Sequence, residues 1–235
     1  MRDILRAELW GDSIGRGVVY DEQRQRYAVG RPSYADILRD KGLVDIQNHA
    51  RFGATVVEGL ADFLQAGSLA GNSVLIQYGG NDCNFNWEQI AESPRGVHSP
   101  KVPLELFEDT LHQFVKAVRA VGKQPILVTL PPLHAESFFY WVTQGIDADN
   151  VLKFLGDASH VYRWQERYSL AVLRVAKAAG VKVFDVRDAF LAADDFRALM
   201  CPDGMHPNLA GHALTAAAAE RALPSLLWQA DEAPS

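Results

Sequence analysis

Short apolar runs alternate along the chain with longer segments whose apolar residues recur every three or four positions. The apolar runs are rich in β-branched residues and are bounded by Gly or Pro, which is typical of buried parallel strands. Strands that alternate with helices in this way predict an α/β fold built on a mainly parallel sheet. We expect strands at residues 4–10, 43–47, 73–78, 125–130 and 181–186.

The segments between these strands predict helices at residues 54–65, 104–121, 162–179 and 207–227. Gly122 and Gly180 follow the second and third of them, as expected of residues that end a helix. The last helix is rich in Ala and is expected to begin at Pro207.

One long segment, residues 133–160, has no strand pattern of its own and is crowded with aromatic residues. We interpret it as a partly helical, aromatic-rich insertion over one edge of the sheet. It can simply cover the sheet or make a dimer contact, or it can form a wall of an acyl pocket together with Phe85 and Trp87. Since the chain shows neither an internal repeat nor a linker, we expect a single domain over residues 1–235.

Composition narrows the class of protein without indicating its chemistry. The 23 Lys and Arg against 29 Asp and Glu give a net charge of −6, and no basic run is present, which argues against a nucleic-acid partner. Two cysteines, Cys83 and Cys201, are too few for a disulfide scaffold, and we expect free thiols, with a redox-sensitive pair as the alternative.

No stretch reaches the ~18 consecutive apolar residues of a spanning helix, so we expect no membrane span. Residues 1–10 are interrupted by charges and lack the apolar region of a signal peptide, which favours a cytoplasmic location. The sequence does not indicate an oligomeric state.

The polar residues that could take part in catalysis follow the predicted strands. They lie in the loops 11–15, 48–55, 79–82 and 203–208. In an open α/β sheet, ligands bind outside the carboxyl ends of the strands, where such loops converge. We therefore expect these loops to form one site.

Ser13 is the candidate nucleophile, because it follows a Gly turn that leads into a helix. A hydroxyl needs a base to remove its proton, and Asp203 and His206, three residues apart, can supply a base and the carboxylate that orients it. The backbone N–H groups of Ser13 and Gly53 and the side-chain amide of Asn81 are candidate donors to an oxyanion. These residue types together predict acyl transfer.

The same segments resemble the SGNH/GDSL hydrolase family. Gly-Asp-Ser-Ile at 11–14 is similar to its first block, with Ile in place of the commoner Leu. Gly53 matches the second-block glycine, Gly-Gly-Asn-Asp at 79–82 the third block, and Asp203-x-x-His206 the fifth. The blocks occur in order, and the resemblance spans residues 4–220.

The resemblance implies a three-layer α/β/α, flavodoxin-like fold with a five-stranded parallel sheet. It also implies a serine esterase in which Ser13 is the nucleophile, His206 the base and Asp203 its orienting acid. Ser13, Gly53 and Asn81 would form the oxyanion hole. The expected substrate is a small-molecule ester.

Neither a cofactor nor a metal is implied, since an activated serine with an oxyanion hole is sufficient for ester hydrolysis. The other histidines form no spaced pair such as a metal site would use.

Several alternatives stay open at this point. Alone, Gly-Asp-Ser can be an ordinary turn, and Asp203 and His206 can cap the helix that follows; their joint occurrence at strand ends favours catalysis. Within the enzyme class, the substrate can be an ester, an acyl-CoA thioester, a lysophospholipid or an O-acetylated carbohydrate. A catalytically silent binding module on the same fold is the alternative from another class.

Overall fold

Five strands form one sheet in the computed structural model, which describes residues 5–226. In chain order they are β1 (Leu5–Gly11), β4 (Val44–Asn48), β5 (Ser73–Gln77), β6 (Gln124–Val128) and β7 (Lys182–Phe184). The order across the sheet is β4-β1-β5-β6-β7, and every neighbouring pair is parallel. This is the flavodoxin-like order, so the predicted fold class is confirmed. Of the predicted element ends, Ile4 and Leu227 lie outside the described residues.

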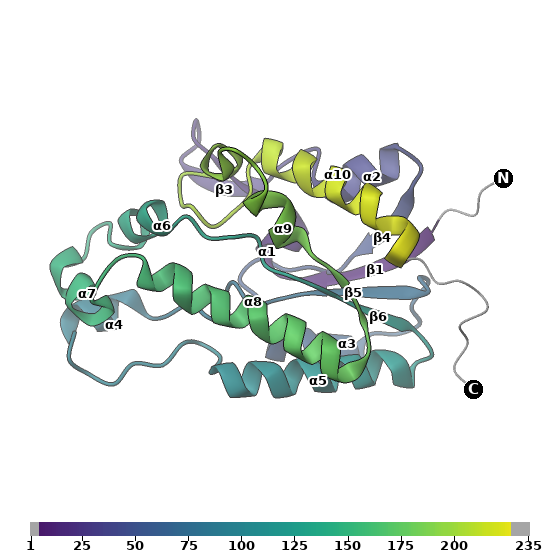
Figure 1. Ribbon diagram of the computed structural model, residues 1–235, viewed down its shortest axis with the longest axis horizontal. Helices are drawn as coiled ribbons and strands as arrows, with labels where there is room; N and C mark the ends of the chain where they lie inside the picture. Colours follow the sequence, from purple (N-terminus) through teal and green to yellow (C-terminus); the bar gives the residue numbers. More distant parts are fainter. Residues whose placement is uncertain (1–4, 227–235) are drawn as a thin grey trace.

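Helices cover both faces of the sheet and give the expected three layers (Figure 1). One face carries α3 (Val56–Gln65), α5 (Leu104–Ala120) and α8 (His160–Ala179). The other carries α2 (Tyr34–Asp40), α9 (Val186–Leu191) and α10 (Leu209–Leu226), with the 3-10 turn η1 (Phe196–Leu199) beside them.

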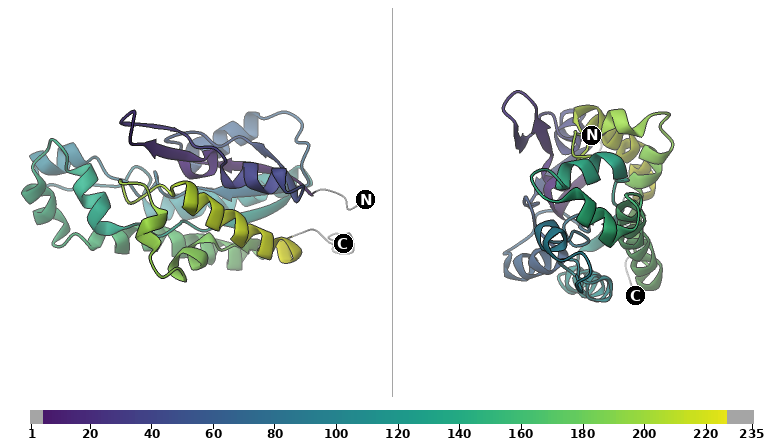
Figure 2. Two further views of the ribbon diagram at one scale, coloured as in Figure 1. Left: turned by 90° about the horizontal axis from the view of Figure 1, so that it is seen from above. Right: turned by 90° about the vertical axis from the view of Figure 1, so that its left-hand side faces the viewer.

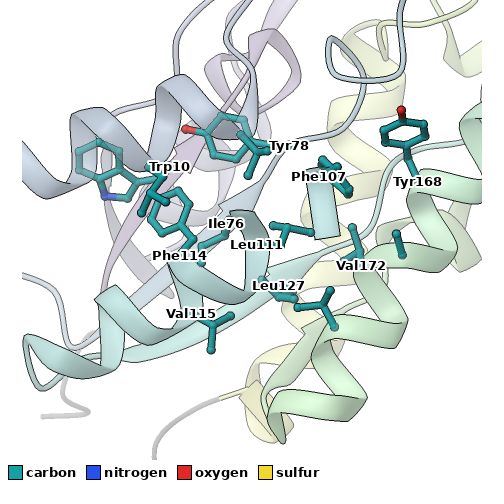
Figure 3. Close-up of a cluster of buried hydrophobic side chains, with 14 of the residues drawn as sticks. Trp10, Ile76, Tyr78, Phe107, Leu111, Phe114, Val115, Leu127, Tyr168 and Val172 are labelled. Carbon is teal, nitrogen blue, oxygen red and sulfur yellow. The ribbon is translucent and has the colours of Figure 1, made fainter. Parts of the chain in front are cut away.

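The larger core lies between the sheet and α3, α5 and α8 (Figure 3). Phe107, Phe114 and Tyr168 are among its fully buried side chains. Burial of such side chains contributes ~1.5–3 kcal/mol each, which makes this layer a rigid support for the loops at the strand ends.

Local sequence explains where several helices begin. Thr55 and Glu58 form a reciprocal capping box at the start of α3, and Ser33 and Asp36 form another at the start of α2. The last helix begins at Leu209 rather than at the expected Pro207, because Pro207 forms a β-bridge with Met200. Likewise β7 is shorter than predicted, because Asp185 already caps α9.

A two-stranded hairpin that the sequence pattern did not reveal follows the first loop. Its strands β2 (Val18–Asp21) and β3 (Arg26–Val29) are antiparallel and come after the short helix α1 (Ser13–Arg16). The strands are only four residues long and mostly half exposed, so they lack the apolar run of the main sheet.

The aromatic-rich segment 133–160 contains α6 (Ala135–Val142) and α7 (Ala148–Leu155). Together with α4 (Trp87–Glu92), these helices lie beyond the carboxyl ends of the strands, at the end of the molecule opposite the chain termini (Figures 1 and 2). They pack on one another and on the start of α8 rather than along an edge strand. Among the described residues, no helix is both long and apolar enough to cross a membrane.

Candidate active site

Ser13, His206 and Asp203 form a continuous hydrogen-bonded row at the carboxyl ends of the strands. The Oγ atom of Ser13 lies 2.8 Å from Nε2 of His206, and Nδ1 of the same ring lies 2.6 Å from Oδ2 of Asp203. A carboxylate only accepts, so Nδ1 carries the ring proton and Nε2 is left to accept from the serine hydroxyl. Residues 193 positions apart in the sequence thus meet in the arrangement that the sequence predicted.

The carboxylate of Asp203 is fully buried and receives more than one hydrogen bond on each oxygen. Its Oδ1 accepts from the backbone N–H groups of Met205 and His206, at 2.8 and 3.0 Å. Burial alone would raise its pKa, but the hydrogen bond and positive charge of His206 and the hydroxyl of Tyr27 outweigh burial and hold the pKa of Asp203 below its usual range. The carboxylate is therefore ionised at neutral pH.

Tyr27, on strand β3 of the hairpin, is the part of this site that sequence reasoning missed. Its hydroxyl donates to Oδ2 of Asp203 at 2.6 Å, the same oxygen that accepts from His206. Its ring centroid lies 5.1 Å from that of His206 and 6.1 Å from that of Trp141 on α6. The available signal was weak: the short runs Val-Val-Tyr-Asp and Arg-Tyr-Ala-Val flank a polar turn, a pattern compatible with a hairpin but also with a loop.

One aromatic ring near the site is open to solvent. Phe52 is 61% exposed, and its ring lies parallel to that of His206, with centroids 6.5 Å apart and planes 4° apart. Ser13 and His206 are themselves only 5% and 2% exposed. The reacting groups are therefore shielded from bulk water, with Phe52 on the solvent side.

The predicted oxyanion donors lie on neighbouring loops. The Nδ2 atom of Asn81 donates to the backbone oxygen of Ala54 at 3.1 Å, which places the amide beside the loop that holds Gly53. Gly53 has φ +76°, a conformation that favours glycine, although a Cβ there would meet no atom within 4 Å. Asn81 keeps one amide hydrogen for a ligand.

Two buried carboxylates hold the loops after β1 and β5 in place through hydrogen bonds to backbone N–H groups. Asp12 caps α1 by accepting from Ile14 N at 2.9 Å, and Asp82 ties the loop after β5 to the start of α3 by accepting from Val56 N at 2.8 Å. Burial raises the pKa of Asp12 to about 6 against the hydrogen bond from Ile14 and the charge of His206. Burial, and further repulsion from Asp12, raises the pKa of Asp82 to about 7 against the hydrogen bond from Val56.

The cysteines are both buried and free, as expected. Cys83 follows the loop of Asn81, while Cys201 accepts a hydrogen bond from Tyr20 N at 3.3 Å, next to the hairpin. Within residues 5–226, no three His, Cys, Asp or Glu side chains gather in a way that could hold a metal ion.

Residues 9–214 match the GDSL-like lipase/acylhydrolase family. The chain belongs to this family. The expected family is thereby confirmed over most of the sequence. No curated protein matches the sequence.

Several solved structures share the GDSL-like hydrolase fold with this chain. The lipase/acylhydrolase from Enterococcus faecalis is 18% identical, with a TM-score of 0.65 over 96% of this chain and 98% of that one. LAE5, a hydrolase from the metagenome of Lake Arreo, is 22% identical, with a TM-score of 0.63 over 95% and 97%. A catalytic mutant of Axe2, an acetylxylan esterase from Geobacillus stearothermophilus, is 19% identical, with a TM-score of 0.64 over 97% and 98%.

The histidine that follows His206 in this family member lies behind the site. His212 is fully buried on α10, and its ring stacks on that of Tyr34 with centroids 6.0 Å apart. Burial, and then repulsion from His206, lowers the pKa of His212 to about 4. Neither of its nitrogens has a hydrogen-bond partner among the described residues, so it is held as the neutral ring.

Proposed function

We propose that the protein hydrolyses carboxylic esters through a covalent acyl-serine intermediate on Ser13. The observation that supports this most directly is the hydrogen-bonded row from Ser13 Oγ through His206 to Asp203, with distances of 2.8 and 2.6 Å. Its geometry is that of a nucleophile, a base and an orienting carboxylate, the three roles that serine acyl transfer needs.

In the first half-reaction, Ser13 Oγ attacks the ester carbonyl carbon while its proton passes to Nε2 of His206. The resulting imidazolium is stabilised by Asp203 through Nδ1. When the tetrahedral intermediate collapses, the bond to the alcohol oxygen breaks and His206 returns the proton to that oxygen. Water then attacks the acyl carbon while its proton passes to His206. When the second tetrahedral intermediate collapses, the bond to Ser13 Oγ breaks and His206 returns that proton to Oγ, which releases the carboxylic acid and restores Ser13.

The oxyanion of each tetrahedral intermediate would be stabilised by the backbone N–H groups of Ser13 and Gly53 and by the amide of Asn81. Removing one such donor typically costs ~3 kcal/mol of transition-state stabilisation. The hydrogen bond from Asn81 to Ala54 supports this assignment, because it fixes the amide next to Gly53.

Tyr27 is assigned as a positioning residue. It touches neither Ser13 nor, in this mechanism, the substrate, and it acts through the carboxylate that it shares with His206. Its hydroxyl fixes Oδ2 of Asp203 in place and takes part of the negative charge that would otherwise face the imidazole.

The test is labelling of the native protein by a fluorophosphonate, together with hydrolysis of nitrophenyl acetate and nitrophenyl butanoate. The native protein should be labelled and turn over these esters, while Ser13→Ala should do neither and should keep the native melting temperature. Undiminished hydrolysis by Ser13→Ala would remove the nucleophile from the proposal. A native protein that neither reacts nor hydrolyses would favour the binding-module alternative.

A further inference from the structure

A partly enclosed cavity of about 260 Å³ lies among the loops and helices beyond the strand ends. Gly80 and Met205 both line it, and each adjoins a residue of the proposed machinery. An ideal Cβ on Gly80 would lie 3.4 Å from Oδ2 of Asp12, the residue before Ser13. The cavity is therefore lined by the residues that adjoin Asn81 and His206 in the chain.

The wall of the cavity comes from the helices that lie beyond the strand ends. Phe85 and Trp87 contribute from the start of α4, Phe138 and Phe154 from the 133–160 segment, and Trp164 from α8. These rings contact one another, with the Phe85 centroid 5.6 Å from that of Phe154 and 5.4 Å from that of Trp164. A packed shell of rings holds its shape, so the cavity is preformed.

Several polar groups of this wall are already engaged by the protein. His98 and His160 also line it, and each uses one ring nitrogen on a backbone oxygen. The indole N–H of Trp87 donates to Asn84 Oδ1 at 2.8 Å, and that of Trp164 donates to the backbone oxygen of Cys83 at 3.1 Å. Gln165 donates to the backbone oxygen of Pro131 at 3.0 Å and accepts from Arg187 at 3.2 Å. A hydroxyl-rich ligand would lose its hydrogen bonds to water here and could replace only some of them, at groups such as the second ring nitrogens of His98 and His160, whereas an apolar ligand has no such bonds to lose.

The cavity wall is attached to the loop of the proposed base. His134 N, at the start of α6, donates to the backbone oxygen of Gly204 at 2.8 Å. Gly204 has φ +66°, and a Cβ on it would lie 2.6 Å from the backbone oxygen of His134, so only glycine allows this approach. The 133–160 segment is thereby built onto the site and does not merely cover the sheet.

We propose that this cavity binds the acyl group of the substrate, and that the group is apolar and about six to ten carbons long. The inference rests on the proposed function and names its substrate class. A cavity of about 150 Å³ holds a six-carbon ring such as benzene, so about 260 Å³ corresponds to roughly ten carbons. The acyl group, unlike the alcohol, stays bonded to Ser13 between the two half-reactions, which suits a preformed pocket.

The test is a series of nitrophenyl esters from acetyl to dodecanoyl, with a second series of acetates of butanol, hexanol and octanol. Burial of each methylene predicts that kcat/KM rises about threefold to fourfold per carbon between butanoyl and octanoyl and stops rising near ten carbons. Acetates should show no such dependence on the alcohol. A profile that peaks at acetyl overturns the proposal, and so does a dependence on the alcohol alone.

Matched variants locate the effect in the cavity. Val161→Phe fills the cavity from α8 and should move the optimum to shorter acyl groups, while Leu170→Phe on the exposed side of the same helix should leave the profile unchanged. Phe154→Ala, at a half-buried position of the wall, should extend the optimum to longer chains. This variant tests the same assignment if Val161→Phe does not fold. Unaltered profiles in folded wall variants would contradict the assignment.

A binding measurement separates this inference from the proposed function. Ser13→Ala cannot form an acyl-serine, so methyl octanoate can be titrated into it while the fluorescence of Trp87 and Trp164 in the wall is followed. We expect saturable binding, and no comparable response to methyl acetate. Absence of binding overturns the cavity assignment even if Ser13 proves to be the nucleophile, and binding supports it even if no ester is turned over.

Discussion

Replacing Tyr27 by Phe tests whether the hairpin hydroxyl tunes the proposed base. The substitution removes a single donor and keeps the ring that packs 5.1 Å from His206 and 5.3 Å from Tyr20. Asp203 retains its hydrogen bonds from Met205 N, His206 N and His206 Nδ1. The carboxylate should therefore stay in place, and the change is chiefly electrostatic.

The magnitude follows from the oxygen that Tyr27 and His206 share. A hydrogen bond to a charged group contributes ~1.5–3 kcal/mol, and two donors compete for the charge on Oδ2. Without Tyr27, about 1 kcal/mol of this interaction becomes available to stabilise the imidazolium form of His206. The acid limb of the kcat/KM profile then moves to higher pH by ~0.7 of a pH unit. The plateau rate should stay within about tenfold of native, because the geometry of the row is retained.

The assay is the pH dependence of kcat/KM for nitrophenyl butanoate between pH 4.5 and 9. Tyr20→Phe is the matched control: it removes a hydroxyl from the same hairpin that, within residues 5–226, donates to the exposed Gln25 side chain at 3.2 Å and not to the catalytic row. That control should reproduce the native profile. If Tyr27→Phe leaves the acid limb where it is, or moves it to lower pH, the electrostatic reasoning is wrong; a loss of plateau rate alone would indicate an orienting role only.

Three further predictions concern stability and reactivity. Because the folded pKa of Asp82 is raised from 3.8 to about 7, the folded chain holds a proton that the unfolded chain has lost, and stability falls as pH rises from about 4 to 7. Asp82→Asn, which keeps an oxygen for Val56 N, should therefore remove about 2.5 kcal/mol of the stability difference between pH 5 and pH 8, measured by denaturant unfolding; an unchanged difference between the two pH values would contradict it. His212 has the opposite sign: its folded pKa is lowered from 6.5 to about 4, so stability falls as pH drops through that window. His212→Phe should lose ~2 kcal/mol less than the native protein between pH 7 and pH 5, and an equal loss in both proteins would show that the ring does not titrate as expected. Finally, burial raises the pKa of the Cys201 thiol to about 11 and that of the Cys83 thiol further, so both should react slowly with a disulfide reagent until the protein is unfolded and then give two thiols; rapid reaction of the folded protein would contradict their burial.

Much of the fold could be predicted from the sequence because its signals are local. Strands buried on both faces, such as β5 and β6, are short β-branched runs, and helices such as α5 carry an apolar stripe. Each such element can therefore be recognised from its own sequence. Ser13 and Asn81 could be chosen because each follows a strand, and parallel strands end at one edge of their sheet. Asp203 and His206 come after α9 and η1, and their side-chain chemistry and spacing were the signal that selected them.

Tyr27 could not be found in this way, and the cavity was indicated only as one of the alternatives for the aromatic segment. The strand that carries Tyr27 is half exposed and four residues long, so its pattern is too weak to separate from a loop, and its partner lies 176 residues away. Phe85, Phe138 and Trp164 are ordinary aromatic residues in the sequence, and only the packing of α4, α6 and α8 turns them toward one space.

The sequence by itself determined the five strands of the main sheet, their parallel arrangement, the long helices and the candidate residues for acyl transfer, since these depend on periodicity, turn residues and side-chain chemistry. The tertiary structure alone decided that Tyr27 and His206 both donate to Oδ2 of Asp203, that the carboxylates of Asp12 and Asp82 are buried, and where the aromatic segment leaves a cavity. Those properties depend on distance and desolvation between residues far apart in the chain, and neither quantity is encoded in any local pattern.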